Sequence, residues 1–381
     1  MSAPIIIIGS GFAAYQLIKT IRRTDKSQEI TVFTLDAGHD YNKPDLSHVF
    51  SNQQTSADLI RMSGDAFAAE NNISLHAFTE VESIDTDNQE IMVKGVARPY
   101  AKLVLATGAQ TFIPPMQGDA TDGVITLNSL REFESAQLQL QNAQRVLVIG
   151  AGLIGTEIAM DLASSGKNVL VVDPNKGLMA NMLPTMIADT LQKNMLEIGV
   201  VFELSKCIKS LDNTESGICA TLSSGDTHLV DCVISAAGLK ANVGLARKSG
   251  LAVNKGLLVN QQLKTSANNV YALGDCAEIN GKVMAYLQPI MLSANALAKT
   301  LLSQPTDLKL PAMLVKIKTP RMPIQLGGNT VHGVTSWQVD LDAQGCSVKA
   351  YNENKEVVGF VVTEGHMKNA FPLLRSLPAT L

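Results

Sequence analysis

Residues 5–14 of the chain read Ile-Ile-Ile-Ile-Gly-Ser-Gly-Phe-Ala-Ala. An apolar strand here runs into a glycine-rich turn, and the turn opens a helix whose free N–H groups suit a phosphate. Gly9 permits the tight turn, Gly11 lets the backbone approach a pyrophosphate, and the small Ala14 lets the helix pack closely on the strand. This stretch therefore predicts a βαβ unit that binds a dinucleotide.

A second copy of the pattern occupies residues 146–155, which read Val-Leu-Val-Ile-Gly-Ala-Gly-Leu-Ile-Gly. The three small residues of this copy are Gly150, Gly152 and Gly155, and Leu153 and Ile154 begin the helix. One such turn is a weak signal, but two in one chain indicate that two dinucleotides are held at once. Holding two is typical of proteins that pass a hydride from one dinucleotide to the other.

Each glycine turn is followed by a second strand that ends at an acid. The strand predicted over residues 29–35 ends at Asp36, and the one over residues 168–172 ends at Asp173. A carboxylate at this place accepts hydrogen bonds from an adenosine ribose. We therefore expect Asp36 and Asp173 to hold the riboses of the first and second dinucleotide, and Asp173 to favour NADH over NADPH.

Composition bounds the remaining possibilities. The chain has 381 residues, 46% of them hydrophobic, and a formal net charge of −4. This length predicts more than one domain, and the charge argues against a nucleic-acid partner. Its apolar runs are too short to cross a bilayer, and the N-terminus lacks the early basic residues of a signal peptide. We expect no membrane partner and a cytoplasmic protein.

The cysteines and histidines exclude two kinds of chemistry. The five cysteines are scattered, and none forms a Cys-x-x-Cys pair, so the sequence provides no redox-active disulfide. Cys276 is best interpreted as a small buried filler. The six histidines lack metal-ligand spacing, so we expect no bound metal.

The order of strands and helices predicts an α/β fold. Two Rossmann-like dinucleotide-binding domains are followed by a small α+β C-terminal domain. Apolar strands that run into a glycine recur at residues 102–108, 232–238 and 269–275, so the second domain repeats the first and is inserted into it. The predicted bounds are 1–115 with 238–305, then 116–237, then 306–381. Within them we expect helices around 292–302 and 368–377, and a hairpin of residues 347–351 and 357–362.

These motifs together resemble the two-dinucleotide flavoprotein reductases, whose fold is glutathione-reductase-like. The resemblance rests on the first glycine turn, Ala106-Thr107-Gly108, residues 150–157 and Leu273-Gly274-Asp275. The missing cysteine pair points to the branch that feeds single electrons to small iron proteins, the rubredoxin, ferredoxin and putidaredoxin reductases. Residues 41–48, 287–290 and 312–320 resemble the NADH-linked reductases of flavorubredoxin, which serve bacterial anaerobic nitric oxide reduction.

The resemblance implies FAD on the first motif, NADH on the second, and a C-terminal interface domain. The FAD-binding residues that it implies are Gly9, Gly11, Ala14, Asp36, Lys43, Pro44, Val81, Thr107, Gly108, Gly274, Asp275, Gln288 and Lys318. The NAD-binding residues that it implies are Gly150, Gly152, Leu153, Ile154, Gly155, Glu157, Asp173 and Gly238.

The resemblance also implies specific roles near the reacting rings. Lys43 would lie against the flavin and stabilise its reduced form, and Glu157 would pair with Lys43 and contact the nicotinamide amide. Val81 would start a strand and pack against the adenine. Lys318 falls where related ferredoxin reductases place a tryptophan near the flavin, whereas the only tryptophan here is Trp337.

Three functions stay open at this point. The acceptor of the electrons would be flavorubredoxin or rubredoxin, an acidic iron protein. The alternatives are a rubredoxin or ferredoxin reductase that serves a hydroxylase or oxygenase, and an FAD- and NADH-binding sensor or interaction protein. The stretch between Asp307 and Asp340 lacks acids yet contains Lys309, Lys316, Lys318 and Arg321. This local positive charge would steer an acidic acceptor to the C-terminal domain.

Overall fold

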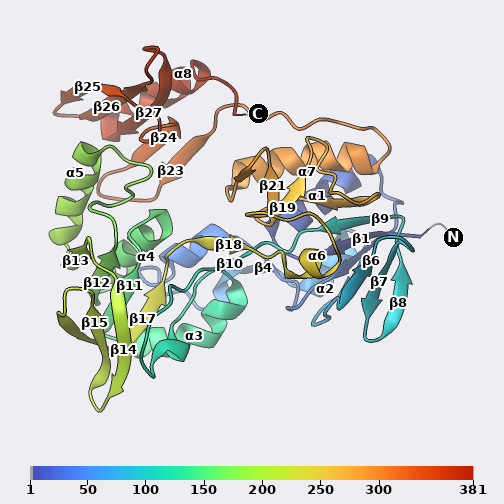
Figure 1. Ribbon diagram of the computed structural model, residues 1–381, viewed down its shortest axis with the longest axis horizontal. Helices are drawn as coiled ribbons and strands as arrows, with labels where there is room; N and C mark the ends of the chain where they lie inside the picture. The colour runs from blue at the N-terminus through green and yellow to red at the C-terminus, as the bar shows by residue number, and fades with distance from the viewer. Residues whose placement is uncertain (1–2, 381) are drawn as a thin grey trace.

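The computed structural model describes residues 3–380, which form two parallel-sheet halves and a C-terminal antiparallel sheet (Figure 1). In the first half the strand order is β20-β9-β1-β2-β5, and every neighbouring pair is parallel. The strands are β1 (Ile5–Ile8), β2 (Ile30–Phe33), β5 (Ser74–His76), β9 (Lys102–Leu105) and β20 (Val270–Ala272). The central strand β1 is fully buried, as its run of isoleucines predicts.

Two long helices lie side by side on one face of this sheet, α1 (Phe12–Thr24) and α7 (Leu287–Leu301). Helix α1 buries Leu17, Ile18 and Ile21, which recur at helical spacing and pack with Leu297 of α7. Because residues 270–301 join the sheet and helices begun by residues 5–105, the chain returns to the first half after building the second.

The second half repeats the first. Its parallel sheet has the order β13-β12-β11-β17, so the strand that precedes the glycine turn again lies between its sequence neighbour and a later strand. The strands are β11 (Arg145–Ile149), β12 (Asn168–Asp173), β13 (Val200–Leu204) and β17 (Cys232–Ser235). The helices of this half are α3 (Leu130–Asn142), α4 (Leu153–Ser164) and α5 (Thr185–Leu196).

Each half also contains a three-stranded antiparallel sheet, which directly precedes β9 in the first half and β17 in the second. These strands are β6 (Ser83–Asp85), β7 (Glu90–Val93) and β8 (Val96–Pro99) in the first half, and β14 (Ile208–Thr214), β15 (Gly217–Leu222) and β16 (Thr227–Val230) in the second. Two antiparallel strands, β10 (Ala109–Thr111) and β18 (Leu239–Ala241), make the two crossings between the halves. The remaining short elements of the two halves are β3 (Asp40–Tyr41), η1 (Lys43–His48), η2 (Ala57–Leu59), β4 (Ile60–Met62), α2 (Gly64–Glu70), η3 (Thr121–Gly123), α6 (Gly244–Lys248), β19 (Leu257–Val259), β21 (Ala277–Ile279) and β22 (Lys282–Val283).

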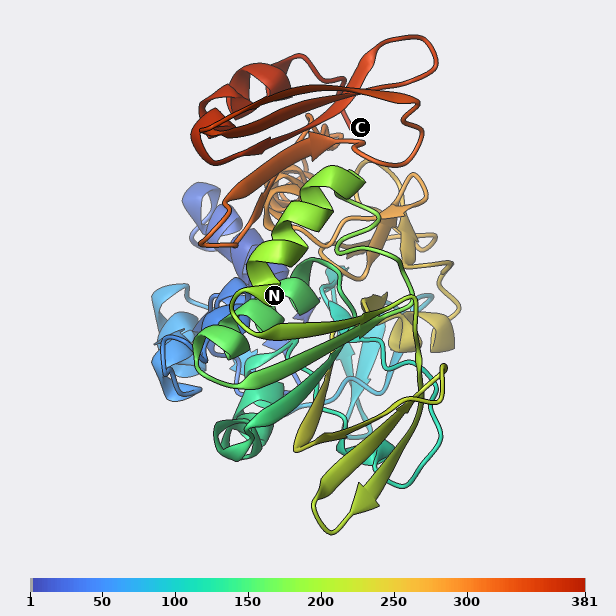
Figure 2. The same cartoon turned by 90° about the vertical axis from the view of Figure 1, so that its left-hand side faces the viewer.

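The C-terminal part is an antiparallel sheet of order β23-β24-β27-β26-β25, which lies above helix α5 in Figure 2. Its elements are β23 (Leu314–Ile317), β24 (Ile324–Gly328), β25 (Ser336–Asp342), β26 (Gly345–Tyr351), β27 (Val357–Thr363), η4 (Glu364–Asn369) and α8 (Ala370–Arg375). The segment that leads to it stays attached to the first half, because Leu308 and Leu310 are buried in the core beneath α7.

One hydrophobic cluster joins all three parts. It contains Leu46 from η1, Val148 and Leu162 from the second half, and Ile317 and Leu326 from the C-terminal sheet. Burying apolar area contributes roughly 25 cal/mol per Å², so a shared core holds the three parts in a defined arrangement. The second half therefore packs directly on both η1 and the C-terminal sheet.

The structure confirms most of the predicted elements and corrects some. The hairpin of residues 347–351 and 357–362 is confirmed by β26 and β27. Strand β2 ends at Phe33, earlier than predicted, and α7 begins at Leu287, earlier than the predicted helix. Residues 368–377 are only partly α-helical, since a 3-10 turn precedes the short α8 around Pro372.

The prediction that Val81 starts a strand is wrong. Strand β6 begins only at Ser83, and Val81 lies in the irregular segment before it. Val81 is nevertheless 7% exposed and packs in the core beside Phe33. Its alternation with Glu80 and Glu82 gave a strand-like pattern, although it enters the core from a loop.

Candidate functional site

The two glycine turns have nearly the same backbone conformation. Gly9 and Gly150 adopt φ of +111° and +107°, a region that favours glycine. The N-cap residues Gly11 and Gly152 adopt φ of −74° and −72°, and neither helix start has a side-chain cap. The first N–H groups of α1 and α4 are thus left for another partner, and a dinucleotide pyrophosphate supplies the oxygens that they lack.

The space beside these turns also fits a bound dinucleotide. Apart from its chain neighbours, a Cβ placed on Gly11 or Gly152 would meet no atom of residues 3–380 within 4 Å, and the same holds for Gly108 and Gly238 at the ends of the later strands. In contrast, a Cβ on Gly9 would lie 2.3 Å from the carbonyl oxygen of Ala106. The first glycine is therefore required by the protein itself, whereas the second faces the open side on which a phosphate would lie.

Asp36 and Asp173, which lie at or just after the end of the second strand of each half, differ in the hydrogen bonds that they accept. Asp36 receives hydrogen bonds on Oδ1 from the Ser10 hydroxyl, the Thr34 hydroxyl and the Gly38 N–H, each at 2.9 Å. No hydrogen bond within residues 3–380 uses its Oδ2, so this oxygen can accept from a ribose. Asp173 uses both oxygens, since Oδ2 accepts from the Ala151 N–H at 2.6 Å and Oδ1 accepts from Asn175. Asp173 thus holds the second glycine turn in place through the backbone of Ala151.

Lys43 does not pair with Glu157, and that expectation is wrong. The Lys43 Nζ lies 3.6 Å from Asp275 Oδ2, beside the turn that follows β20. The reason is the length of η1, because a 3-10 helix rises about 2 Å per residue and separates its two ends. Lys43 begins η1 and reaches the first half, whereas Ser47 and His48 end η1 and meet Glu157. The structure therefore brings Lys43 together with the predicted FAD residue Asp275.

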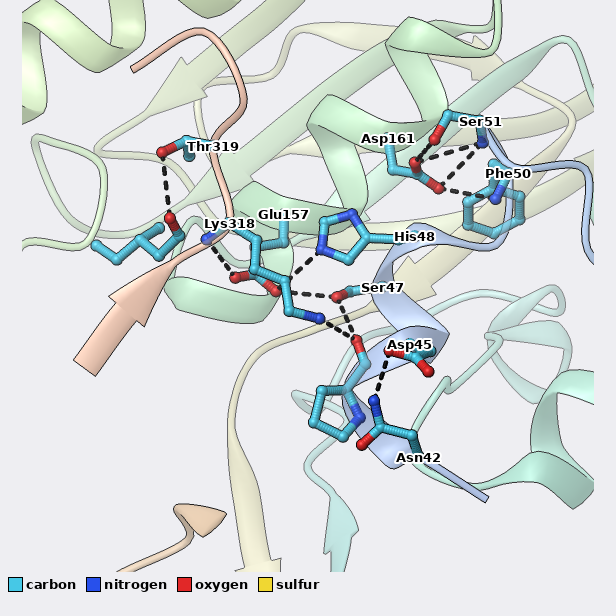
Figure 3. A network of polar contacts seen from close by, with 12 residues as sticks. Asn42, Asp45, Ser47, His48, Phe50, Ser51, Glu157, Asp161, Lys318 and Thr319 are labelled. Carbon is cyan, nitrogen blue, oxygen red and sulfur yellow. Dashed lines mark hydrogen bonds and ion pairs between the residues drawn. The ribbon is translucent and has the colours of Figure 1, made fainter. Parts of the chain in front are cut away.

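Glu157 lies where the three parts of the molecule meet (Figure 3). Its side chain on α4 is only 5% exposed. Oε2 accepts a hydrogen bond from the Ser47 hydroxyl of η1 at 2.9 Å, and Oε1 accepts from the backbone N–H of Lys318 at 2.9 Å. His48 Nε2, which is buried and has no hydrogen-bond partner within residues 3–380, lies 3.9 Å from Oε2.

Lys318 reaches the same junction from the end of β23. Its Nζ donates a hydrogen bond to the carbonyl oxygen of Pro44 at 2.8 Å, and Pro44 also accepts from the Ser47 hydroxyl. The C-terminal sheet therefore holds η1 and α4 through one lysine, by its backbone and by its side chain (Figure 3). Whether Lys318 touches a flavin stays a prediction.

The other predicted residues line the two turns. Thr107 exchanges hydrogen bonds with Asn242, which ties the two crossings together beside Gly108. Gly274 adopts φ of +83° and packs against Ala13 of α1. Gln288 lies in the first turn of α7. In the second half, Ala236 contacts Gly155 and Gly150, and Leu153 and Ile154 form the first turn of α4.

Sequence reasoning missed Ser47, His48 and Asp161. Asp161 is 4% exposed and accepts hydrogen bonds from Phe50 and Ser51, in the segment after η1. One signal was available, because α4 is apolar apart from Thr156, Ser164 and two acids one turn apart. Acids in a helix that is buried on most sides need donors from another element.

Other chemistry is limited within residues 3–380. The five cysteines are free, and burial raises the pKa of the Cys276 thiol, whose Sγ lies 3.4 Å from two carbonyl oxygens. Among the described residues, no group of three His, Cys, Asp or Glu side chains could hold a metal ion. None of the helices in this part of the chain combines the length and apolar character needed to cross a membrane.

Comparison with known proteins assigns the family. The model of the pyridine nucleotide-disulphide oxidoreductases matches residues 3–299, most of the chain. The chain belongs to the pyridine nucleotide-disulphide oxidoreductase family. A second model, described as the rubredoxin binding C-terminal domain, matches residues 307–377. The two matches meet at the segment between α7 and β23.

Curated relatives match over the whole length. A protein of Aliivibrio fischeri named nitric oxide reductase FlRd-NAD(+) reductase is 57% identical over 380 residues, which is 100% of both chains. A protein of the same name from Vibrio vulnificus is 52% identical over 99% of this chain and 98% of its own. One from Shigella sonnei is 45% identical over 99% of this chain and all of its own.

Solved structures share the fold at low identity. A ferredoxin reductase of Rhodopseudomonas palustris has a TM-score of 0.89 and 23% identity, covering 99% of this chain and 96% of that one. The NADH:rubredoxin oxidoreductase of Clostridium acetobutylicum has a TM-score of 0.81 and 21% identity, covering 99% and 95%. Both confirm the predicted architecture of two Rossmann-like parts and a C-terminal sheet.

The two glycines of the first turn should respond differently to alanine. We expect Gly11→Ala to fold normally but to bind FAD roughly ten-fold or more weakly, because its methyl group would occupy the open phosphate face. Gly9→Ala should destabilise the apoprotein itself, because its methyl group meets the Ala106 carbonyl. Thermal unfolding of the apoprotein and titration with FAD measure both effects. An unchanged FAD affinity in Gly11→Ala would place the phosphates elsewhere.

The Lys43–Asp275 contact predicts a specific coupling. Lys43→Met and Asp275→Asn should each slow flavin reduction by NADH, and the double variant should lose less than the two losses combined. A partly exposed ion pair gives a coupling of about 0.5–1 kcal/mol, or roughly two- to five-fold. The matched cycle of Lys43→Met with Glu157→Gln should show less coupling. Stopped-flow rates of flavin reduction at saturating NADH measure both couplings. A stronger coupling of Lys43 to Glu157 than to Asp275 would contradict the observed contact.

Proposed function

We propose that this protein is an NADH-dependent flavoprotein reductase that passes electrons through FAD to the rubredoxin domain of flavorubredoxin, in anaerobic nitric oxide detoxification. The observation that carries the proposal is the junction at Glu157, where both dinucleotide halves contact the C-terminal sheet. The whole-length relatives and the rubredoxin-binding match over residues 307–377 support the choice of acceptor.

In this proposal the first half holds FAD. The turn at Gly9 and Gly11 and the N-terminus of α1 would bind the pyrophosphate, and the free Oδ2 of Asp36 would accept from the adenosine ribose. Lys43 would lie against the flavin with Asp275 as its partner. A cation there stabilises negative charge on a reduced ring, and the nearby carboxylate limits how far Lys43 can move. Bound FAD supplies the step from two-electron to one-electron transfer.

The second half would hold NADH. The turn at Gly150 and Gly152 and the N-terminus of α4 would bind its pyrophosphate. Asp173 lies 7% exposed at the end of β12, and its negative charge would repel the additional phosphate of NADPH. Glu157, in the second turn of the same half's helix, would face the nicotinamide. No side chain is required to remove a proton in this scheme, so the protein's task is to position two rings.

The acceptor would dock on the C-terminal part. Lys309 and Lys316 are exposed, and no ion pair within residues 3–380 joins either to an acid. The other two cations of the basic stretch are engaged, since Lys318 donates to Pro44 and Arg321 lies 3.4 Å from Glu197. The positive charge available to an acidic partner therefore centres on Lys309 and Lys316, fewer residues than the sequence indicated.

Two further expectations belong to this proposal. The domain bounds of 1–115 with 238–305, 116–237 and 306–381 agree with where the sheets change, and we retain them as proposed bounds. We also propose a cytoplasmic location, where NADH is available and five free thiols would remain reduced.

The direct test compares acceptors side by side. FAD-loaded protein is given NADH with the rubredoxin domain of flavorubredoxin, with a free rubredoxin, or with a ferredoxin, and reduction of each iron centre is followed by absorbance. We expect the highest kcat/KM for the flavorubredoxin domain. The fastest reduction of ferredoxin would favour the alternative of a reductase for an oxygenase. Absence of NADH oxidation with every acceptor would favour a binding protein without turnover.

Electrostatic docking makes a second prediction. The second-order rate of acceptor reduction should fall steeply as added salt shortens the Debye length to about 8 Å, whereas flavin reduction by NADH should change little. Lys316→Glu should slow acceptor reduction at low salt by roughly three- to ten-fold, through the association rate. Lys94→Glu, in the β7–β8 turn at the far end of the molecule, is the matched control. Equal effects of the two variants would place the docking surface elsewhere.

A further inference from the structure

Helix α4 carries a second buried carboxylate one turn after Glu157. Asp161 is 4% exposed, and all its hydrogen-bond donors come from the segment that follows η1 in the other half. Its Oδ2 accepts from the Phe50 N–H at 2.8 Å, and both oxygens accept from the Ser51 N–H at 3.3 Å. The Ser51 hydroxyl also donates to Oδ1, as Figure 3 shows.

The charge of Asp161 is not neutralised by a cation. Within residues 3–380 no lysine, arginine or histidine nitrogen forms an ion pair with it. Two acids one turn apart on a helix also repel each other. An apolar side chain of similar volume is generally no worse for stability than a buried charge, so stability alone does not account for Asp161. The carboxylate instead fixes the position of the facing backbone, since it accepts hydrogen bonds from two consecutive N–H groups.

Together the two acids hold η1 at both sides of its C-terminal end. Glu157 accepts from Ser47, and Asp161 accepts from Phe50 and Ser51. Leu46, just before these contacts, and Val49, between them, are buried in the cluster shared with α4. The position of η1 relative to α4 is therefore set by charge-assisted hydrogen bonds around an apolar contact, which are geometrically stricter than apolar contact alone.

We propose that Asp161 is a positioning residue for hydride transfer, because it sets the distance between the helix that would bind NADH and the segment that would line the flavin. This inference rests on the proposed function. Bound NADH would supply the hydride, with both electrons of its nicotinamide C4–H bond, to N5 of the bound flavin and would leave as NAD⁺. Asp161 would act without touching either ring, because its oxygens accept from Phe50 and Ser51. A displacement of about 1 Å costs up to a hundred-fold in such a step.

The experiment has two readouts on Asp161→Asn. Amide hydrogen exchange over residues 46–54, measured in the apoprotein and in the FAD-loaded protein, should become about ten-fold or more faster. The limiting rate of flavin reduction at saturating NADH should fall by about ten- to hundred-fold. The dissociation constants for FAD and NADH should change by less than about three-fold. If Asp161 had a purely structural role, amide exchange would become faster, but the reduction rate would not fall while the two dissociation constants stay nearly unchanged.

Asp231→Asn is the matched control. The Asp231 carboxylate also accepts two consecutive backbone N–H groups, from Gln144 at 2.8 Å and Arg145 at 2.7 Å, but at the opposite end of β11 from Gly150. Hydrogen bonds from Arg145 hold the pKa of Asp231 at about 2. The control should lower thermal stability while leaving exchange at 46–54 and the flavin reduction rate unchanged.

Ser51→Ala keeps the test decisive if Asp161→Asn does not fold. It removes only the hydroxyl donor to Asp161, so by itself it should slow flavin reduction by several-fold. Where Asp161→Asn does fold, adding Ser51→Ala to it should change the rate little further. Faster exchange with an unchanged reduction rate in either variant would overturn the proposal. If NADH does not reduce the FAD of the wild-type protein, the proposed function is overturned instead. Amide hydrogen exchange would then still test whether Asp161 holds residues 50 and 51 in place.

Discussion

The arrangement of this molecule depends on how helix α4 satisfies two buried carboxylates. Glu157 and Asp161 lie on a helix that is otherwise almost entirely apolar, so each needs donors from outside its own half. The donors come from η1, from the segment after it, and from the backbone of Lys318. Because leaving either acid without donors costs more than the bonds themselves return, the three parts are held in one arrangement.

The chemistry that this arrangement permits follows from the repeat. Each half brings a strand, a glycine turn and an uncapped helix start to one edge of its sheet, so each can hold one pyrophosphate. The halves differ in their acids, since Asp36 keeps one oxygen free while Asp173 uses both to brace its own turn. The first site is thus open to a ribose through its carboxylate. In the second site these bonds hold the carboxylate in place, and its contact with a ribose stays a prediction.

The C-terminal sheet is part of the site as well as the proposed docking surface. Lys318 donates its backbone N–H to Glu157 and its side chain to Pro44, so the sheet that would meet the iron protein also touches both dinucleotide halves. The apolar cluster beneath it includes residues from all three parts. An acceptor bound on this sheet would lie over the elements that position the rings.

The sequence by itself determined the strand, glycine turn and helix that open each repeat, and the later apolar strands that run into a glycine, because glycine patterns and apolar runs act over a few residues. It also determined the hairpin of β26 and β27 and the acids that end the second strands. What only the tertiary structure decided is which charges meet. Lys43 pairs with Asp275 and Glu157 with Ser47, since the length of η1 separates its two ends and the fold brings a different half to each. Partners 110 residues apart or more, such as Ser47 with Glu157 and Ser51 with Asp161, leave no mark on local sequence, because only the packed core sets their distance.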